Sequence, residues 1–282
     1  MNAKLAGDDA NQALIQAWEA LGSYRDQAIL VGGMAVFIYQ MHPDFRGIRG
    51  IAPLPTVDID VAVSNPLLAE PQGNLAQQLV DAGFVRREVR REETCYTRFD
   101  LPAAMNRTGE MLNPYIEFLC ATDEIGVRDD EPQQGLRAHL SPYAWMLFHE
   151  PWSIHHPSGM SYRVPHPLTY FVQKLLIRGT RPLVKRTKDL VDVLFVMGGF
   201  RERLPDIFAA RQTIALHHDD GVEQIANACG EFERLFTGHN PTGPVQIAAG
   251  YSENVTTPEM QQVAAIAALV ANDIVAAERQ SR

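Results

Sequence analysis

The stretches "ILVGGMAVFIY" (residues 29–39) and "TVDIDVAV" (residues 56–63) decide the expected fold. The first predicts an apolar strand that stops at two glycines, followed by an apolar helix. The second predicts a strand in which two aspartates alternate with apolar residues. Because side chains two apart on a strand share a face, Asp58 and Asp60 are expected to point together, away from the apolar side.

Two carboxylates on one face repel each other unless a cation lies between them. Their oxygens suit a divalent ion whose coordination shell is completed by phosphate. The alternative is a solvent-facing strand with an incidental Asp-x-Asp pattern. Glu117, the only acid in "YIEFLCA" (115–121), favours the ion site if its strand lies beside 57–63, although a half-exposed strand position is common. Three carboxylates could then hold one or two Mg²⁺ (or Mn²⁺) ions for phosphoryl or nucleotidyl transfer.

The glycine pair fits the same chemistry. A strand that runs through Gly32 and Gly33 into a helix leaves backbone N–H groups at the helix start, and glycine lets phosphate approach them. Many strand–turn–helix junctions carry glycine without binding anything. The pattern is neither a P-loop nor a dinucleotide fingerprint, so it supports neither of those folds.

Composition limits the partners. The 282 residues carry a net charge of −9, which disfavours broad binding to duplex DNA. Residues 171–188 nevertheless hold six cations and no acid before residue 189, which is compatible with a local anion site. Three widely spaced cysteines indicate neither a disulfide framework nor a zinc site, and a reducing cytoplasm is expected. No membrane span is expected.

The order of the expected elements indicates an α+β protein with two parts. Residues 1–140 are expected to form a mixed β-sheet with flanking helices, including strands at 27–31, 56–64 and 114–121 and a polar loop at 123–135. Residues 141–282 are expected to form a hairpin followed by helices, including one near 202–216.

Taken together, "LVGGMAVFIY", "TVDIDVAV" and "YIEFL" resemble the nucleotidyltransferase superfamily with the DNA polymerase β-like core. The helix "YFVQKLLIR" (170–178), followed by "TKDLVDVLF" (187–195), resembles the branch that includes the nucleotidyltransferase toxins of abortive-infection and type IV toxin–antitoxin systems. The resemblance covers roughly residues 27–197 and leaves the helical tail unassigned.

The resemblance implies a role for each matching residue. Asp58 and Asp60 would bind the metals, and Glu117 would be the third metal-site carboxylate, which orients or deprotonates the acceptor hydroxyl. The nucleotide would be bound by residues of the glycine turn, the approach to the aspartate strand and the second part: Gly32, Gly33, Thr56, Lys174, Lys188 and Asp189.

The residues of the second part also have plainer interpretations. Lys188 with Asp192, and Lys185 with Asp189, are spaced for surface ion pairs on a helix. Lys174 could extend from a partly buried helix with only its ammonium in water.

Two positions depart from the family pattern. Leu54 stands where an arginine usually precedes the Asp-x-Asp strand, so Arg46 or Arg49 would have to take its place. The turn is Gly-Gly rather than Gly-Ser and lacks the serine hydroxyl.

The leading hypothesis is a cytoplasmic, magnesium-dependent nucleotidyltransferase. It would move a nucleoside monophosphate from a nucleoside triphosphate to a hydroxyl of a tRNA end, a protein or a small molecule. A toxin-like member would also have a cognate antitoxin as partner. The alternative is a catalytically silent nucleotide- or partner-binding module on the same fold. A haloacid dehalogenase-type phosphatase also uses Asp-x-Asp, but it lacks the preceding Gly-Gly helix.

Overall fold

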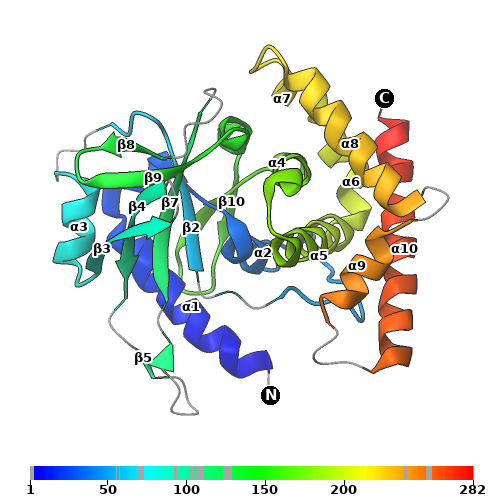
Figure 1. Cartoon of the computed structure of the whole chain (residues 1–282), viewed down its shortest axis with the longest axis horizontal. Coiled ribbons are helices and arrows are strands. Elements are labelled where there is room, and N and C mark those ends of the chain that lie inside the picture. The colour runs from blue at the N-terminus through cyan, green and yellow to red at the C-terminus, as the bar shows by residue number, and fades with distance from the viewer. Residues whose placement is uncertain are drawn as a thin grey trace. The chain divides into compact units, whose positions relative to one another are not determined.

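The structure, a computed structural model, describes residues 3–54, 56, 58–68, 73–91, 94–101, 104–105, 111–112, 114–122, 129–237, 241–251 and 256–281. The chain divides into two compact units. The first unit comprises Met1–Ala35, Pro55–Phe148 and His155–Val164, and the second comprises Val36–Leu54, His149–Ile154 and Pro165–Arg282. The expected class is confirmed: a mixed α+β part with a seven-stranded sheet is followed by a helical part (Figure 1).

The first unit holds the sheet and the helices around it. Its helices are α1 (Ala3–Ala20), the start of α2 (Gly32–Tyr39), α3 (Leu75–Asp81) and the 3-10 helices Gly22–Gln27 and Ala144–Phe148. Its sheet strands are β1 (Ala28–Leu30), β2 (Asp58–Val63), β3 (Val85–Arg91), β4 (Thr94–Asp100), β7 (Tyr115–Ala121), β8 (Asp129–Gln133) and β9 (Leu136–Ser141). A small pair in this unit is β5 (Ala104–Met105) with β6 (Met111–Leu112). The hairpin of β10 (Trp152–His155) and β11 (Ser161–Val164) begins in residues of the second unit and ends in residues of the first.

The sheet has the order β1-β2-β7-β4-β3, and β9 pairs with β7 on one side and with β8 on the other. β2 and β7 run parallel, whereas β4 is antiparallel to both β7 and β3. The prediction that the strand of Glu117 lies beside the strand of Asp58 and Asp60 is therefore confirmed, and Asp60 is the direct neighbour of Glu117.

The two faces of the sheet differ in the way that the alternating sequences predict. On one face, Ile59, Val61, Ile116 and Phe118 are at most 1% exposed and belong to the core. On the other face, β2 and β7 begin with half-buried polar side chains and continue into an apolar cluster that includes Ala62 and the 3-10 helix residues Ala144 and Leu147. The polar patch thus lies at the starts of the two parallel strands.

The second unit is built from helices. They are α4 (Pro167–Ile177), α5 (Leu183–Gly199), α6 (Leu204–Ala209), α7 (Arg211–Ala215), α8 (Gly221–Thr237), α9 (Gly243–Ala249), α10 (Thr257–Gln280) and the 3-10 helices Arg178–Thr180 and Arg201–Arg203. Pro167 at the start of α4 fits the helix N-terminus, where its missing N–H costs no hydrogen bond. Helix α5 packs against α4, α9 and α10.

Helix α10 corrects one expectation. The sequence predicts no membrane-length apolar run, but α10 is long and apolar enough to span a membrane by length and composition, with a mean hydropathy of 1.4 over its best window. The helix contacts α5, α6, α8 and α9 and buries Ala267, Ala271 and Ile274. One side of α10 thus packs on neighbouring helices, and 33% of its apolar window is buried. One such helix is weak evidence for a membrane span.

Two other expectations differ from the structure, and one helix is unexpected. Part of the predicted polar loop, Asp129–Gln133, is strand β8, because backbone pairing with β9 satisfies its polar groups whatever its side chains. The predicted helix at 202–216 is three short helical pieces, and Pro205 starts one of them. Helix α9 is not predicted by the sequence pattern.

Candidate functional site

One face of the sheet carries two rows of side chains that run across four adjacent strands. The first row, from β3 through β4 and β7 to β2, is Arg87, Arg98, Glu117 and Asp60. The second row, in the same strand order, is Val85, Asp100, Tyr115 and Asp58. Directly opposed side chains of neighbouring strands are close enough to interact. The face therefore places three carboxylates on β2 and β7 beside two guanidiniums on β4 and β3.

Asp60 lies against the glycine turn. The backbone N–H of Val31 donates to the carbonyl of Asp60 at 2.9 Å, which fixes the turn to β2. Gly32 has φ +62°, and a Cβ built on it would lie 2.1 Å from Asp60 Oδ2. Only glycine suits this position, because it accepts the left-handed backbone and leaves room for the carboxylate. The carboxylate thus lies at the N-terminal end of α2, where the helix dipole favours negative charge.

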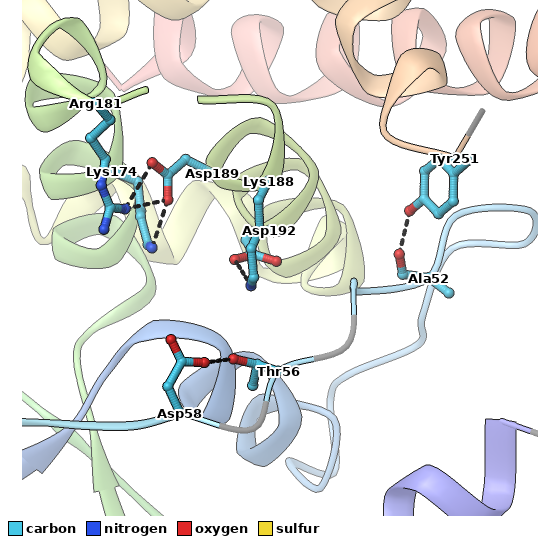
Figure 2. Close-up of polar contacts among 9 residues, drawn as sticks. All are labelled: Ala52, Thr56, Asp58, Lys174, Arg181, Lys188, Asp189, Asp192 and Tyr251. Carbon is cyan, nitrogen blue, oxygen red and sulfur yellow. Dashed lines mark hydrogen bonds and ion pairs between the residues drawn. The ribbon is translucent and has the colours of Figure 1, made fainter. Parts of the chain in front are cut away.

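Asp58 is oriented by Thr56, which lies two residues before it in the chain. The hydroxyl of Thr56 donates a hydrogen bond to Asp58 Oδ1 (Figure 2). This contact orients the first aspartate before any ligand is present. In this structure Thr56 supports a carboxylate; its contact with nucleotide stays a prediction.

Glu117 is the third carboxylate of the face. Its Oε2 lies 3.9 Å from Nε2 of His139, and its side chain is 12% exposed. The three acids also act on their neighbour Tyr115: burial, followed by the charges of Glu117, Asp58 and Asp60, raises the pKa of the Tyr115 hydroxyl to about 12. Negative charge therefore gathers at this point of the face.

The chemistry of the donors can be compared with what a divalent ion needs. Within the described part of the chain, no group of three His, Cys, Asp or Glu side chains could hold a metal ion. Mg²⁺, however, is usually bound by one or two carboxylates, with waters and substrate phosphates completing its octahedron. Asp58 and Asp60, with oxygen ligands on one face, fit such a substrate-completed site.

A second charged cluster lies in the helical unit, on α4, α5 and the turn between them. Lys174 Nζ donates to Asp189 Oδ1 at 2.8 Å, and Arg181 Nη1 lies 2.8 Å and 2.9 Å from the two carboxylate oxygens of Asp189 (Figure 2). Lys174 is 7% exposed and Asp189 2%. Burial opposes ionisation of Asp189, but the charges of Lys174 and Arg181 outweigh it and hold the pKa of Asp189 below its ordinary value.

One turn further along α5, Lys188 Nζ donates to Asp192 Oδ2 at 2.9 Å. The interpretation of this pair as a surface ion pair is wrong, because Asp192 is fully buried. Burial raises the pKa of Asp192 despite the nearby charges of Lys188 and Lys174. Among the described residues, Asp192 Oδ1 has no hydrogen-bond partner. The other predicted surface pair is also wrong: Asp189 is buried, and its charge partners are Lys174 and Arg181 rather than Lys185.

Residues 45–52, which precede β2 in the chain, belong to the second unit and contact its helices. Gly199 accepts a backbone hydrogen bond from Arg46 at 2.9 Å, and a Cβ on Gly199 would lie 2.1 Å from the Phe45 ring. The hydroxyl of Tyr251 donates to the carbonyl of Ala52 (Figure 2). The guanidinium of Arg46 donates to the carbonyl of Pro43 at 2.5 Å, so in this structure it serves the segment itself.

The predicted site residues fall into two groups. Gly32, Thr56, Asp58, Asp60 and Glu117, together with Gly33, belong to the first unit, whereas Lys174, Lys188 and Asp189 belong to the second. Each group forms its own contacts as described above.

Four charged or aromatic residues that lie beside these groups are not singled out by the sequence: Tyr115, Arg98, His139 and Arg181. The sheet residues could have been identified only from the register in which the strands pair. Asp192 is picked out by its spacing from Lys188, but the sequence does not reveal that it is buried.

Comparison with known proteins supplies one finding. A family model described as nucleotidyltransferase matches residues 10–216, which include all of the predicted site residues. No curated protein and no solved structure matches the chain.

Proposed function

Since the chain belongs to the nucleotidyltransferase family, we propose that it transfers a nucleoside monophosphate from a nucleoside triphosphate to an acceptor hydroxyl and that magnesium is required. The observation that carries the proposal is the register of β2 and β7, which brings Asp58, Asp60 and Glu117 to one face beside the glycine turn. Carboxylates gathered in this way have no evident structural purpose, because like charges oppose each other.

In this proposal Asp58 and Asp60 hold magnesium, with Glu117 as the third carboxylate. When bound, the ion neutralises the charge of the phosphates and of the transition state. Thr56 keeps Asp58 oriented, and the N-terminal end of the α2 dipole attracts the carboxylate of Asp60. Glu117 orients or deprotonates the acceptor hydroxyl, and the imidazole of His139 lies 3.9 Å from the Glu117 carboxylate.

Gly32 and Gly33 offer the start of α2 to a phosphate, with Gly32 also making room for Asp60. Lys174 and Lys188 are proposed to bind the nucleotide. The contacts of Asp189 with Lys174 and Arg181 suggest that Asp189 acts by fixing the position of Lys174. The acceptor is an RNA end such as that of tRNA, a protein or a small molecule, and a toxin-like role would add a cognate antitoxin. The three free cysteines support a cytoplasmic location.

The test is transfer of label. Native protein, Asp58→Asn and Asp60→Asn are incubated with magnesium and each of the four α-phosphate-labelled triphosphates, in the presence of cellular RNA, cellular protein or small metabolites. The proposal predicts labelled product from the native protein and at least about 100-fold less from each variant. Equal labelling by the variants would remove the sheet face from catalysis.

The alternative is a catalytically silent module that binds nucleotide or a partner. Leu54 in place of the family's arginine favours it, as does the engagement of Lys174 with Asp189. Magnesium-dependent nucleotide binding without transfer to any acceptor would support this alternative.

A further inference from the structure

Arg98 occupies a position on the carboxylate face that the proposed function does not use. In the first row of the face it lies directly beside Glu117, which in turn lies beside Asp60. The strands β2, β7 and β4 thus carry an aspartate, a glutamate and an arginine at the same level of the sheet. A cation at this level faces the same solvent space as the carboxylates.

The guanidinium of Arg98 is held in place by two neighbours. Its Nε lies 2.6 Å from Asp100 Oδ1, and its Nη2 donates to Asp100 Oδ2 at 3.3 Å. Its Cζ lies 4.6 Å from the centre of the Tyr115 ring, within the range of a cation–π contact. The Arg98 side chain is nevertheless 26% exposed. The group is therefore oriented in advance and still open to a ligand.

Arg98 faces two carboxylates, its ion-pair partner Asp100 and its cross-strand neighbour Glu117, and the first of these is shared. Asp100 pairs with Arg87 as well as with Arg98, so one carboxylate serves two guanidiniums. A substrate that binds here must bring positive charge to Asp58 and Asp60 and negative charge to Arg98. A polyphosphate bound through a metal ion satisfies both, because it brings the cation to the acids and its own oxygens to the arginine.

We propose that Arg98 binds a phosphate oxygen of the nucleotide, with Tyr115 and Asp100 as its positioning residues. This inference rests on the proposed function, because it takes the polyphosphate to lie over Asp58 and Asp60. Arg98 is two strands from Asp60, about 10 Å at the backbone. An arginine side chain and a chain of phosphates bridge that span together. Guanidinium also suits this role by geometry, since its fork of N–H donors matches two phosphate oxygens.

The probe is inorganic tripolyphosphate, which carries the phosphate chain common to all four nucleotides. Its binding to the full-length protein is measured by calorimetry with magnesium, for the native protein and for Arg98→Gln. Loss of a charge-assisted hydrogen bond predicts at least about tenfold weaker binding. Arg98→Lys keeps the charge without the fork and should recover part of the affinity. This second variant also keeps the ion pair with Asp100, in case Arg98→Gln fails to fold.

Arg86→Gln is the matched control. Arg86 is on β3, pairs with Glu88 at 2.9 Å and is registered with Phe99, so it points to the opposite face. Its removal changes the net charge equally and should alter binding by less than about twofold.

Native-like binding by Arg98→Gln would overturn the role of Arg98 and leave the proposed nucleotide site intact. No binding by the native protein would overturn both. Equal losses in Arg98→Gln and Arg86→Gln would show a general charge effect and would also overturn the role of Arg98.

Discussion

The sheet face and the helix cluster both collect aspartates beside basic residues, but they balance charge in different ways. On the sheet, Asp58, Asp60 and Glu117 are gathered by strand register with the arginines to one side. On the helices, Asp189 lies between Lys174 and Arg181 in a buried ion-pair network. The first arrangement places three carboxylates together, whereas the second surrounds one aspartate with two cations.

This difference separates binding from architecture. A face on which three carboxylates lie together gains free energy from an added cation, whereas a buried network of paired charges loses free energy when one partner is removed. The comparison therefore predicts that charge removal on the sheet affects function with little loss of stability. On the helices charge removal lowers stability, in addition to any effect of Lys174 and Lys188 on nucleotide binding.

The largest effect on stability is expected for Asp189→Ala. The change leaves the ammonium of Lys174 buried without its carboxylate, and breaking such a pair costs about 3–5 kcal/mol. The free energy of unfolding, measured by urea denaturation, should fall by that amount at pH 7. Because the pKa of Asp189 is lowered in the folded state, its contribution is present above the ordinary aspartate pKa and is lost as pH falls through the lowered value.

The control is Asp273→Ala in the same unit. Asp273 pairs with Arg201 at 2.9 Å, but both side chains are exposed. Its removal should cost less than about 1 kcal/mol. Similar losses for the two variants would mean that the helix network is no more than a surface feature.

A smaller loss of stability is expected for Gly32→Ala. The left-handed backbone at φ +62° costs about 1–2 kcal/mol for an alanine, and the new Cβ displaces the carboxylate of Asp60. Thermal unfolding should report the loss of stability, and magnesium-dependent nucleotide binding should weaken at the same time. Gly230→Ala in α8 is the opposite control, because its Cβ meets no atom within 4 Å and alanine favours helix. Unchanged nucleotide binding by Gly32→Ala would contradict the placement of Asp60 in the site.

The smallest effect is expected for Asp192→Asn. Burial raises the pKa of Asp192, so its ionised form opposes folding. A raised carboxyl pKa gives stability that is present below the unfolded pKa and is lost as pH rises through the folded pKa. At pH 7 the free energy of unfolding of the variant should lie within about 1 kcal/mol of the native value or slightly above it. The stability of the variant relative to the native protein should decrease toward pH 4. Urea denaturation at pH 7 and pH 4 measures this difference. A relative stability that increases at pH 4 would be inconsistent with the buried charge.

Much of the sheet unit could be predicted from the sequence, because local patterns determine it. Alternation over residues 56–63 and 114–121 predicts the strands and their polar faces, and the glycine pair predicts the turn. The rows of the face could not be predicted in full. Arg98 and Tyr115 become neighbours of the carboxylates only through the register of β4 on β7, which depends on contacts far apart in the sequence.

The helix cluster was predicted less well. Spacing of four residues along α5 suggests pairs of Lys185 with Asp189 and Lys188 with Asp192, and only the second pair forms. Packing of α4 on α5 instead brings Lys174 to Asp189, and burial converts an apparent surface motif into a core network. Helix periodicity does not reveal which of two polar positions a neighbouring helix will cover.

The most direct test of the account is thermal stability with magnesium and each of the four nucleoside triphosphates, for the native protein and Asp58→Asn. A ligand that binds only the folded state raises the melting temperature by mass action. The account predicts a rise for the native protein that requires magnesium and disappears in Asp58→Asn, while the melting temperature without ligand stays nearly unchanged. An equal rise in both proteins, or unfolding of Asp58→Asn without ligand, would contradict the claim that the sheet face is the nucleotide site.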